Sequence, residues 1–193
     1  MRREIISLGI ILALTVVVFA SVFVYYPLTV TATPTPPSVV FQPGSNAGQP
    51  DVGQGNTISV IIGANSTSAS ITIHPTYQEN YYKNVTLVVN NDSKAYNVYI
   101  VFTSVSNNLP AGSVVTLFVY SGNTLVKAID ITSPSINTPI SIGSLPAGSK
   151  WELDFYVKIP EGTNINGASY GVTANLVFTP SSETPPANPS AGR

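Results

Sequence analysis

Residues 151–159 read WELDFYVKI, and this stretch decides the fold class. Large apolar side chains stand at every second position, where Trp151, Leu153, Phe155, Val157 and Ile159 alternate with Glu152, Asp154, Tyr156 and Lys158. A period of two places the first set on one face of an extended strand and the second set on the other. The stretch predicts a β-strand with one buried face and with Glu152 and Asp154 on the solvated face.

Similar strand-forming stretches extend through most of the chain and are separated by Gly, Pro, Asn and Ser. They cover residues 57–62, 69–74, 84–90, 96–104, 114–120, 124–131 and 170–178. No amphipathic helix pattern follows residue 26. Short strands at this spacing predict an all-β fold, a two-sheet antiparallel sandwich of the jelly-roll or immunoglobulin-like type. A hydrophobic N-terminal helix is expected to precede it.

The N-terminus has the pattern of an export segment. Arg2 and Arg3 precede an apolar run of 22 residues, 5–26, and such a run spans a bilayer of about 30 Å. The basic residues predict that the following chain lies outside the membrane. Two interpretations remain open: a signal peptide cut between Ala32 and Thr33, after the small-x-small tripeptide VTA, or an uncleaved anchor. In both, the body is secreted, extracellular or at the cell surface, and only residues 5–26 contact a membrane.

The sequence divides into four regions: an export segment (1–32), a Pro- and Gly-rich extension (33–56), the predicted sandwich (57–179) and a flexible tail (180–193). A short strand-forming segment interrupts the extension, and it comprises Ser38, Val39, Val40, Phe41 and Gln42. We expect it to lie between two flexible tracts, outside the folded body. Because a lone strand leaves its backbone donors and acceptors unpaired, it must add to a sheet of its own domain or of another molecule.

Composition argues against several functions. Charged residues make up 9% of the chain, the net charge is −1 and the lysines are scattered, so no nucleic acid partner is expected. Cysteine is absent, which excludes disulfides and thiolate metal sites. The single histidine, His74, is expected at a surface turn, and residues 143–145 are expected to form a loop rather than a nucleophile elbow. We predict no catalytic, cofactor-binding or metal-binding residue, no cofactor and no enzymatic activity.

Three Asn-x-Ser/Thr sequons stand in the predicted sandwich, at Asn65, Asn84 and Asn91. In an exported chain such sequons are acceptors for N-linked glycans. Asn65 and Asn91 fall in predicted loops and Asn84 at the start of a predicted strand. We therefore expect glycosylation at these three asparagines.

Four segments resemble, in order, the TasA/camelysin family and the exported subunits of archaeal bundling pili and threads. They are residues 84–91 (NVTLVVNN), 95–102, 144–159 (SLPAGSKWELDFYVKI) and 167–178 (GASYGVTANLVF). The resemblance implies a jelly-roll-like subunit that polymerises by donor-strand complementation, in which the N-terminal strand of one subunit fills a groove in the next. It also implies that residues 38–42 are the donor strand. Camelysin's peptidase activity is not expected here, because one histidine leaves it without metal ligands.

These observations favour a structural function. We predict a secreted subunit that joins identical subunits in a head-to-tail homopolymer, an extracellular pilus or thread for adhesion or biofilm. Strand addition supplies main-chain hydrogen bonds, and a head-to-tail contact that does not close gives a fibre. The alternative is a membrane-anchored cell-surface β-sandwich that acts as a binding or envelope module.

Overall fold

The computed structural model describes residues 23–187 and divides the chain into two units, Met1–Thr35 and Pro36–Arg193. In the first unit, residues 23–35 form neither helix nor strand and their side chains are exposed. Most of the predicted N-terminal helix lies outside the described residues. Within the part of the chain that is described, no helix is long and apolar enough to cross a membrane.

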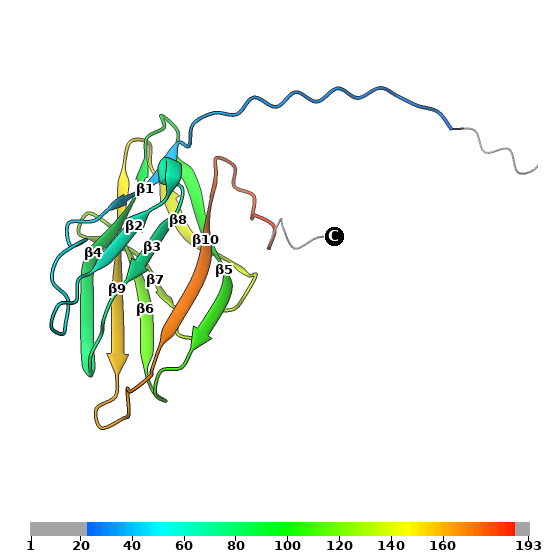
Figure 1. Cartoon of the computed structure of the whole chain (residues 1–193). Coiled ribbons are helices and arrows are strands. Elements are labelled where there is room, and N and C mark those ends of the chain that lie inside the picture. The colour runs from blue at the N-terminus through cyan, green and yellow to red at the C-terminus, as the bar shows by residue number, and fades with distance from the viewer. Residues whose placement is uncertain (1–22, 188–193) are drawn as a thin grey trace, which may run out of the picture. The chain divides into compact units, whose positions relative to one another are not determined.

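The second unit is all-β, as predicted, and its strands pair antiparallel (Figure 1). One short 3₁₀ helix, Ala64–Ser66, interrupts them. The strands are β1 (Val39–Pro43), β2 (Ser59–Ile62), β3 (Ala69–Thr72), β4 (Gln78–Asn90), β5 (Tyr96–Asn107), β6 (Val114–Ser121), β7 (Thr124–Asp130), β8 (Pro139–Leu145), β9 (Lys150–Ile159) and β10 (Tyr170–Thr179).

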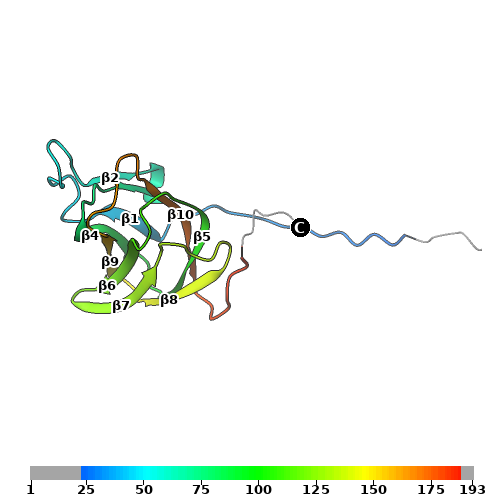
Figure 2. The same cartoon turned by 90° about the horizontal axis from the view of Figure 1, so that it is seen from below.

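The strands form two larger sheets and a hairpin. The order is β1-β4-β9-β6-β7 in the five-stranded sheet and β10-β5-β8 in the three-stranded sheet, while β2 and β3 pair only with each other. The two larger sheets face each other, and β7 and β8 lie side by side at one margin (Figure 2). The β2–β3 hairpin lies towards the opposite margin, over β4.

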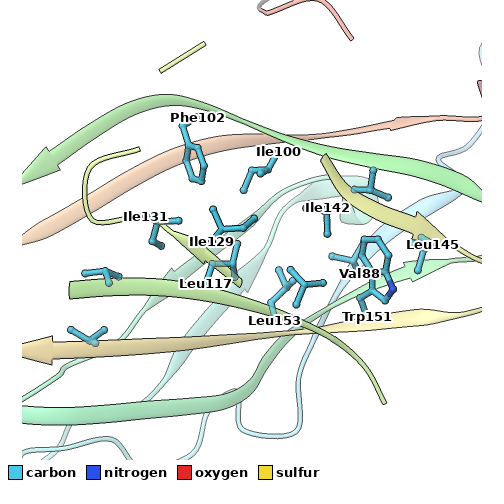
Figure 3. Close-up of a cluster of buried hydrophobic side chains, with 14 of the residues drawn as sticks. Val88, Ile100, Phe102, Leu117, Ile129, Ile131, Ile142, Leu145, Trp151 and Leu153 are labelled. Atoms are coloured by element: carbon cyan, nitrogen blue, oxygen red, sulfur yellow. The ribbon is translucent and has the colours of Figure 1, made fainter. Parts of the chain in front are cut away.

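The inner face of β9 is buried, as its alternating sequence pattern predicts. Trp151, Leu153 and Val157 are buried there and join a cluster to which both larger sheets contribute. Figure 3 shows Ile100 and Phe102 of β5 pointing across the interior toward this layer. Burial of such side chains stabilises the fold by about 1.5–3 kcal/mol each. The two sheets therefore share one core.

A smaller cluster attaches the hairpin to β4. Ile58, Tyr82 and Val85 are buried together, and partly buried apolar side chains of the hairpin pack against them. Val60 comes from β2 and Ile71 from β3. The hairpin therefore packs on β4 around Tyr82 and Val85.

The prediction that residues 143–145 form a loop is wrong, because they belong to β8. This strand was not predicted from the sequence because it contains Pro139 and Gly143, and both residue types are poor strand formers. Gly143 is needed for packing: a Cβ atom there would lie 3.2 Å from Val126 Cγ1 and 4.0 Å from the ring of Trp151. The strand pairs with β5 through a bulge.

The expectation that Asp154 lies on a solvated face is also wrong, because only 2% of the residue is exposed. The β4–β9 register shifts between Tyr82 and Thr86, where β4 bulges. The bulge brings the backbone N–H of Asn84 to 2.6 Å from Asp154 Oδ1, and the Tyr81 hydroxyl donates to Oδ2 at 2.7 Å. A buried carboxylate is stable when its oxygens accept hydrogen bonds in this way.

The extension is part of the second unit from Pro36 onward. β1 adds to the edge of β4, and the loop after it is anchored by hydrogen bonds from the backbone N–H of Gly44 to Val85 O and of Asn46 to Asn84 O. A Cβ atom on Gly44 would collide with the Asn84 carbonyl. The Gly and Pro content of the loop after β1 predicts a flexible linker, but the loop is packed on the sheet.

Candidate functional site

Residues of β3 and β10 line the two sides of a groove. Residues 69–75 form one wall and residues 168–174 the other, and the groove has a volume of about 900 Å³. Protein interiors contain few voids larger than a water molecule. A groove of this size beside the core is space for another molecular segment.

Core side chains form the floor of the groove. Both larger sheets contribute to it, and all of these residues are apolar except Thr86: Phe41, Thr86, Ile100, Phe102, Leu109, Val115, Leu117, Val119, Ile131, Ile142, Leu153, Phe155, Val157 and Ile159. The hydroxyl of Thr86 is fully buried and has no hydrogen-bond partner among the described residues. An unpaired buried hydroxyl costs about 1–3 kcal/mol. The floor is therefore apolar, and most of its side chains are already buried.

Each wall ends in a strand edge without a neighbour. β3 pairs on one side with β2, and β10 pairs on one side with β5, and within residues 23–187 no strand pairs with their other edges. Unpaired strand edges present backbone N–H and C=O groups that another strand can bond. The groove thus combines an apolar floor with two rows of backbone partners.

The groove carries almost no charge. Its lining contains no Asp, Glu, Lys or Arg, and its only ionisable side chains are His74 and Tyr170. The Tyr170 hydroxyl donates to Ile131 O, and burial, with a smaller contribution from the Asp130 carboxylate, raises the pKa of Tyr170 to about 12. Tyr170 therefore stays neutral at physiological pH, and the groove is matched to an uncharged ligand.

His74 is half-buried and does more than fill a surface turn. Its Nδ1 lies 3.1 Å from Asp51 Oδ2, and its backbone N–H donates to the same oxygen at 2.6 Å. The Asp51 side chain is 1% exposed. Burial alone would raise the pKa of Asp51, but hydrogen bonds from the Val52 and His74 N–H groups lower it below 3.8. The pair ties the loop after β1 to the end of the β3 wall.

The predicted donor segment lies in its own sheet. Val39 and Phe41 of β1 stand opposite Asn90 and Val88 of β4, and both pack against the main core cluster. Val40 faces the other side of the strand. This is the alternative that the sequence left open, an edge strand of its own domain. Exchange of residues 38–42 between subunits stays a prediction.

The three sequons have different surroundings. Asn65 is exposed in the 3₁₀ helix Ala64–Ser66, and Asn91 is exposed directly after the end of β4. Asn84 lies in the β4 bulge with its Oδ1 buried, and Thr86, the hydroxyl residue of that sequon, is fully buried. The geometry favours Asn65 and Asn91 as acceptors, and the modification itself stays a prediction.

Among residues 23–187 no group of three or more His, Cys, Asp or Glu side chains could hold a metal ion. The Asp51–His74 pair is the one close carboxylate–imidazole contact in that range. The groove is therefore the feature of the described chain that calls for a function.

Comparison with family models and with curated proteins finds no match for this chain. The resemblance to the TasA/camelysin family therefore rests on the sequence pattern alone. The groove itself was not predicted from the sequence. Both of its walls were predicted as strands. The pairing of distant segments determines which strand edges have no partner, and that pairing was not predicted.

Proposed function

We propose that this protein is a secreted structural subunit that polymerises head to tail into an extracellular filament by strand addition. The observation that carries the proposal is the uncharged groove between the unpaired edges of β3 and β10. A strand from a second copy would bond one or both edges and pack in the groove between them. Because donor and acceptor are different surfaces, each added copy leaves a free donor and a free groove, and the assembly continues as a fibre.

In this proposal the two facing sheets form a jelly-roll-like β-sandwich that lacks one strand. The β2–β3 hairpin would continue the layer of β10, β5 and β8, with the groove as the missing position between them. The apolar, uncharged lining of the groove supports this interpretation. Burial of apolar side chains of that strand would supply the affinity.

The test is a substitution that blocks the groove. Val172 of β10 is half-buried and lines the groove, so Val172→Lys should stop polymerisation of the exported full chain by placing a charge where an apolar strand must dock. Ala69→Trp should do the same by filling the space, because Ala69 is half-buried on the inner face of β3 and lines the groove. Sedimentation and negative-stain imaging measure the outcome.

The matched control is Asn175→Lys, which places the same charge at an exposed position of β10 that does not line the groove. It should polymerise like the parent chain. The proposal is wrong if the parent chain stays monomeric at high concentration, or if both blocked variants fold and still form fibres. In that case a surface-anchored binding module becomes the better explanation.

A further inference from the structure

Three aromatic side chains form a row on the outer face of the five-stranded sheet, the face turned away from the core. Tyr81 belongs to β4, and Phe118 and Tyr120 belong to β6. The alternate β6 residues Leu117 and Val119 are buried in the core, so the two rings of β6 point outward. The ring centroid of Phe118 lies 6.0 Å from that of Tyr81 and 6.3 Å from that of Tyr120. This aromatic row therefore crosses the middle strand β9, which lies between β4 and β6.

Tyr81 is exposed and yet held in place. The residue is 50% exposed, while its hydroxyl donates at 2.7 Å to Oδ2 of Asp154. Asp154 is itself 2% exposed, and its other oxygen accepts from the Asn84 N–H. The buried carboxylate thus restrains the Tyr81 ring on the surface of the sheet. An aromatic side chain that is ordered before binding loses little conformational freedom when a ligand packs on it.

Hydrogen-bonding groups of β9 flank the aromatic row. Glu152 lies opposite Tyr120 in the β6–β9 register, and Tyr156 lies opposite Tyr81 in the β4–β9 register. Both residues are half-buried and alternate with the core residues of β9, so they share the outer face with the rings. A carboxylate accepts hydrogen bonds, and a phenol hydroxyl donates and accepts them. The outer face therefore offers apolar ring surfaces next to polar groups.

We infer that this face binds a neutral polysaccharide. Sugar rings would stack on the aromatic row, and their hydroxyl groups would bond Glu152 and Tyr156. A sugar ring with equatorial hydroxyls has apolar C–H faces and a polar rim, which matches aromatic surfaces with hydrogen-bonding groups beside them. Cellulose-type and chitin-type chains repeat such rings in a flat, extended strand, and a row of aromatic rings suits an extended chain better than a single sugar. The surface is separate from the groove, and the inference goes beyond assembly.

The charges on this face argue for a neutral ligand. Glu152 stands beside the aromatic row, and the outward pair Glu79 and Lys158 brings Oε1 to 4.0 Å from Nζ. The central part of a protein interface is depleted of charged residues, and an anionic membrane surface attracts clustered basic residues. This face has neither property, because charges of both signs are interspersed on it. A chain of neutral sugars is repelled by neither sign.

Removal of one ring tests the inference. Isothermal titration calorimetry of the full chain with cellohexaose and with chitohexaose should show binding of at least one of them. Tyr120→Ala should weaken that binding by about tenfold or more, because truncation of an aromatic residue at a binding surface commonly has an effect of this size. Tyr99→Ala is the matched control. Tyr99 is half-buried between two core residues of β5, on the outer face of the other sheet, and its variant should bind like the parent.

Glu152 separates a neutral ligand from a cationic one. Glu152→Ala removes the hydrogen-bonding group and should weaken oligosaccharide binding by about threefold to tenfold. Glu152→Gln keeps a hydrogen-bonding group without the charge and should weaken binding less. Both variants should keep the parent's melting temperature, since Glu152 is only half-buried. Equal losses of affinity in the two variants would show that the ligand depends on the charge, which contradicts a neutral ligand.

The remaining outcomes also decide the inference. It is overturned if neither oligosaccharide binds the parent chain, or if Tyr120→Ala and Tyr99→Ala bind equally well. If Tyr120→Ala instead changes only the lateral association of fibres in negative-stain images, the face binds a second copy and the inference is wrong. The proposed function is tested separately, because Val172→Lys should prevent polymerisation and leave oligosaccharide binding intact.

Discussion

The carboxylate of Asp154 on β9 accepts a hydrogen bond of 2.6 Å from the backbone N–H of Asn84 in the β4 bulge. Asn84 has φ 44°, in the left-handed region that asparagine tolerates better than most residues. The carboxylate thus pairs a backbone donor that the bulge removes from the strand ladder. This contact fixes the place where β4 changes register against β9.

Removal of the carboxylate should therefore destabilise the fold. Asp154→Ala leaves the Asn84 N–H without its buried acceptor, and we expect the free energy of unfolding to fall by about 1–3 kcal/mol. Glu152→Ala, two residues along on the same face and only half-buried, should change it by less than about 0.5 kcal/mol. Urea unfolding of the groove-blocked monomer measures both, and equal losses would contradict the assigned role of Asp154.

A second prediction concerns Asn90, which is fully buried at the end of β4. Its Nδ2 donates to Lys94 O at 2.8 Å and to Pro146 O at 2.9 Å, and its Oδ1 accepts from the Asp92 N–H at 2.9 Å. Asn90→Ala should cost about 2–4 kcal/mol, since several backbone groups lose partners at once. Asn91→Ala, at the exposed neighbouring position, should be close to neutral in the same denaturant titration.

Acid should weaken the Asp51–His74 contact. The pKa of Asp51 is lowered below 3.8 in the folded chain, so its contribution to stability is present above that pH and is lost as the pH falls through the folded value. Asp51→Asn should reduce stability by about 1–2 kcal/mol at pH 7. The difference between the two proteins should shrink below about pH 4. A difference that stays constant down to pH 2 would argue that the carboxylate charge contributes nothing.

Alkali should act through Tyr170 beside the groove. Its folded pKa of about 12 lies above the ordinary value of 10.0, so the stability linked to its proton is present below pH 10 and is lost as the pH rises toward 12. Tyr170→Phe has no proton to lose, and its stability should fall less steeply across that interval. Parallel alkaline unfolding curves for the two proteins would be the contrary result.

Glycans should be found at Asn65 and Asn91 but not at Asn84. Both favoured asparagines are exposed, whereas the Asn84 sequon ends in the buried Thr86. Intact mass measurement of Asn65→Gln, Asn91→Gln and Asn84→Gln proteins from the native host decides this. The first two should each lose one glycan mass, and the third should lose none.

The sequence predicts most of this fold because period-two alternation is a local property. It is clear in β9, and it indicates strands over most of β2 to β7 and over β10. The β4 bulge breaks that pattern at Lys83 and Asn84, so the first half of β4 was not predicted as a strand. The same bulge contacts Asp154, which the alternation of β9 predicts to be exposed. An Asn within a strand-forming run was the available signal.

The groove and the packed loop after β1 depend on pairing between distant segments, and no local pattern carries that information. A Gly- and Pro-rich stretch has the same composition whether it is a linker or is anchored, as here, by hydrogen bonds to β4 and by Asp51. Likewise, the sequence of β10 does not indicate that one of its edges has no paired strand among residues 23–187.

The unpaired edges of β3 and β10 would give the proposed fibre a direction. At one tip a subunit would keep an empty groove, and at the opposite tip a subunit would have a donor with nowhere to insert. Binding stabilises only the copy whose groove is filled, so the subunit with the empty groove is the least stable in the chain. Heat or protease should therefore erode such fibres from that tip alone, one subunit after another, and a short capping peptide should protect the whole length.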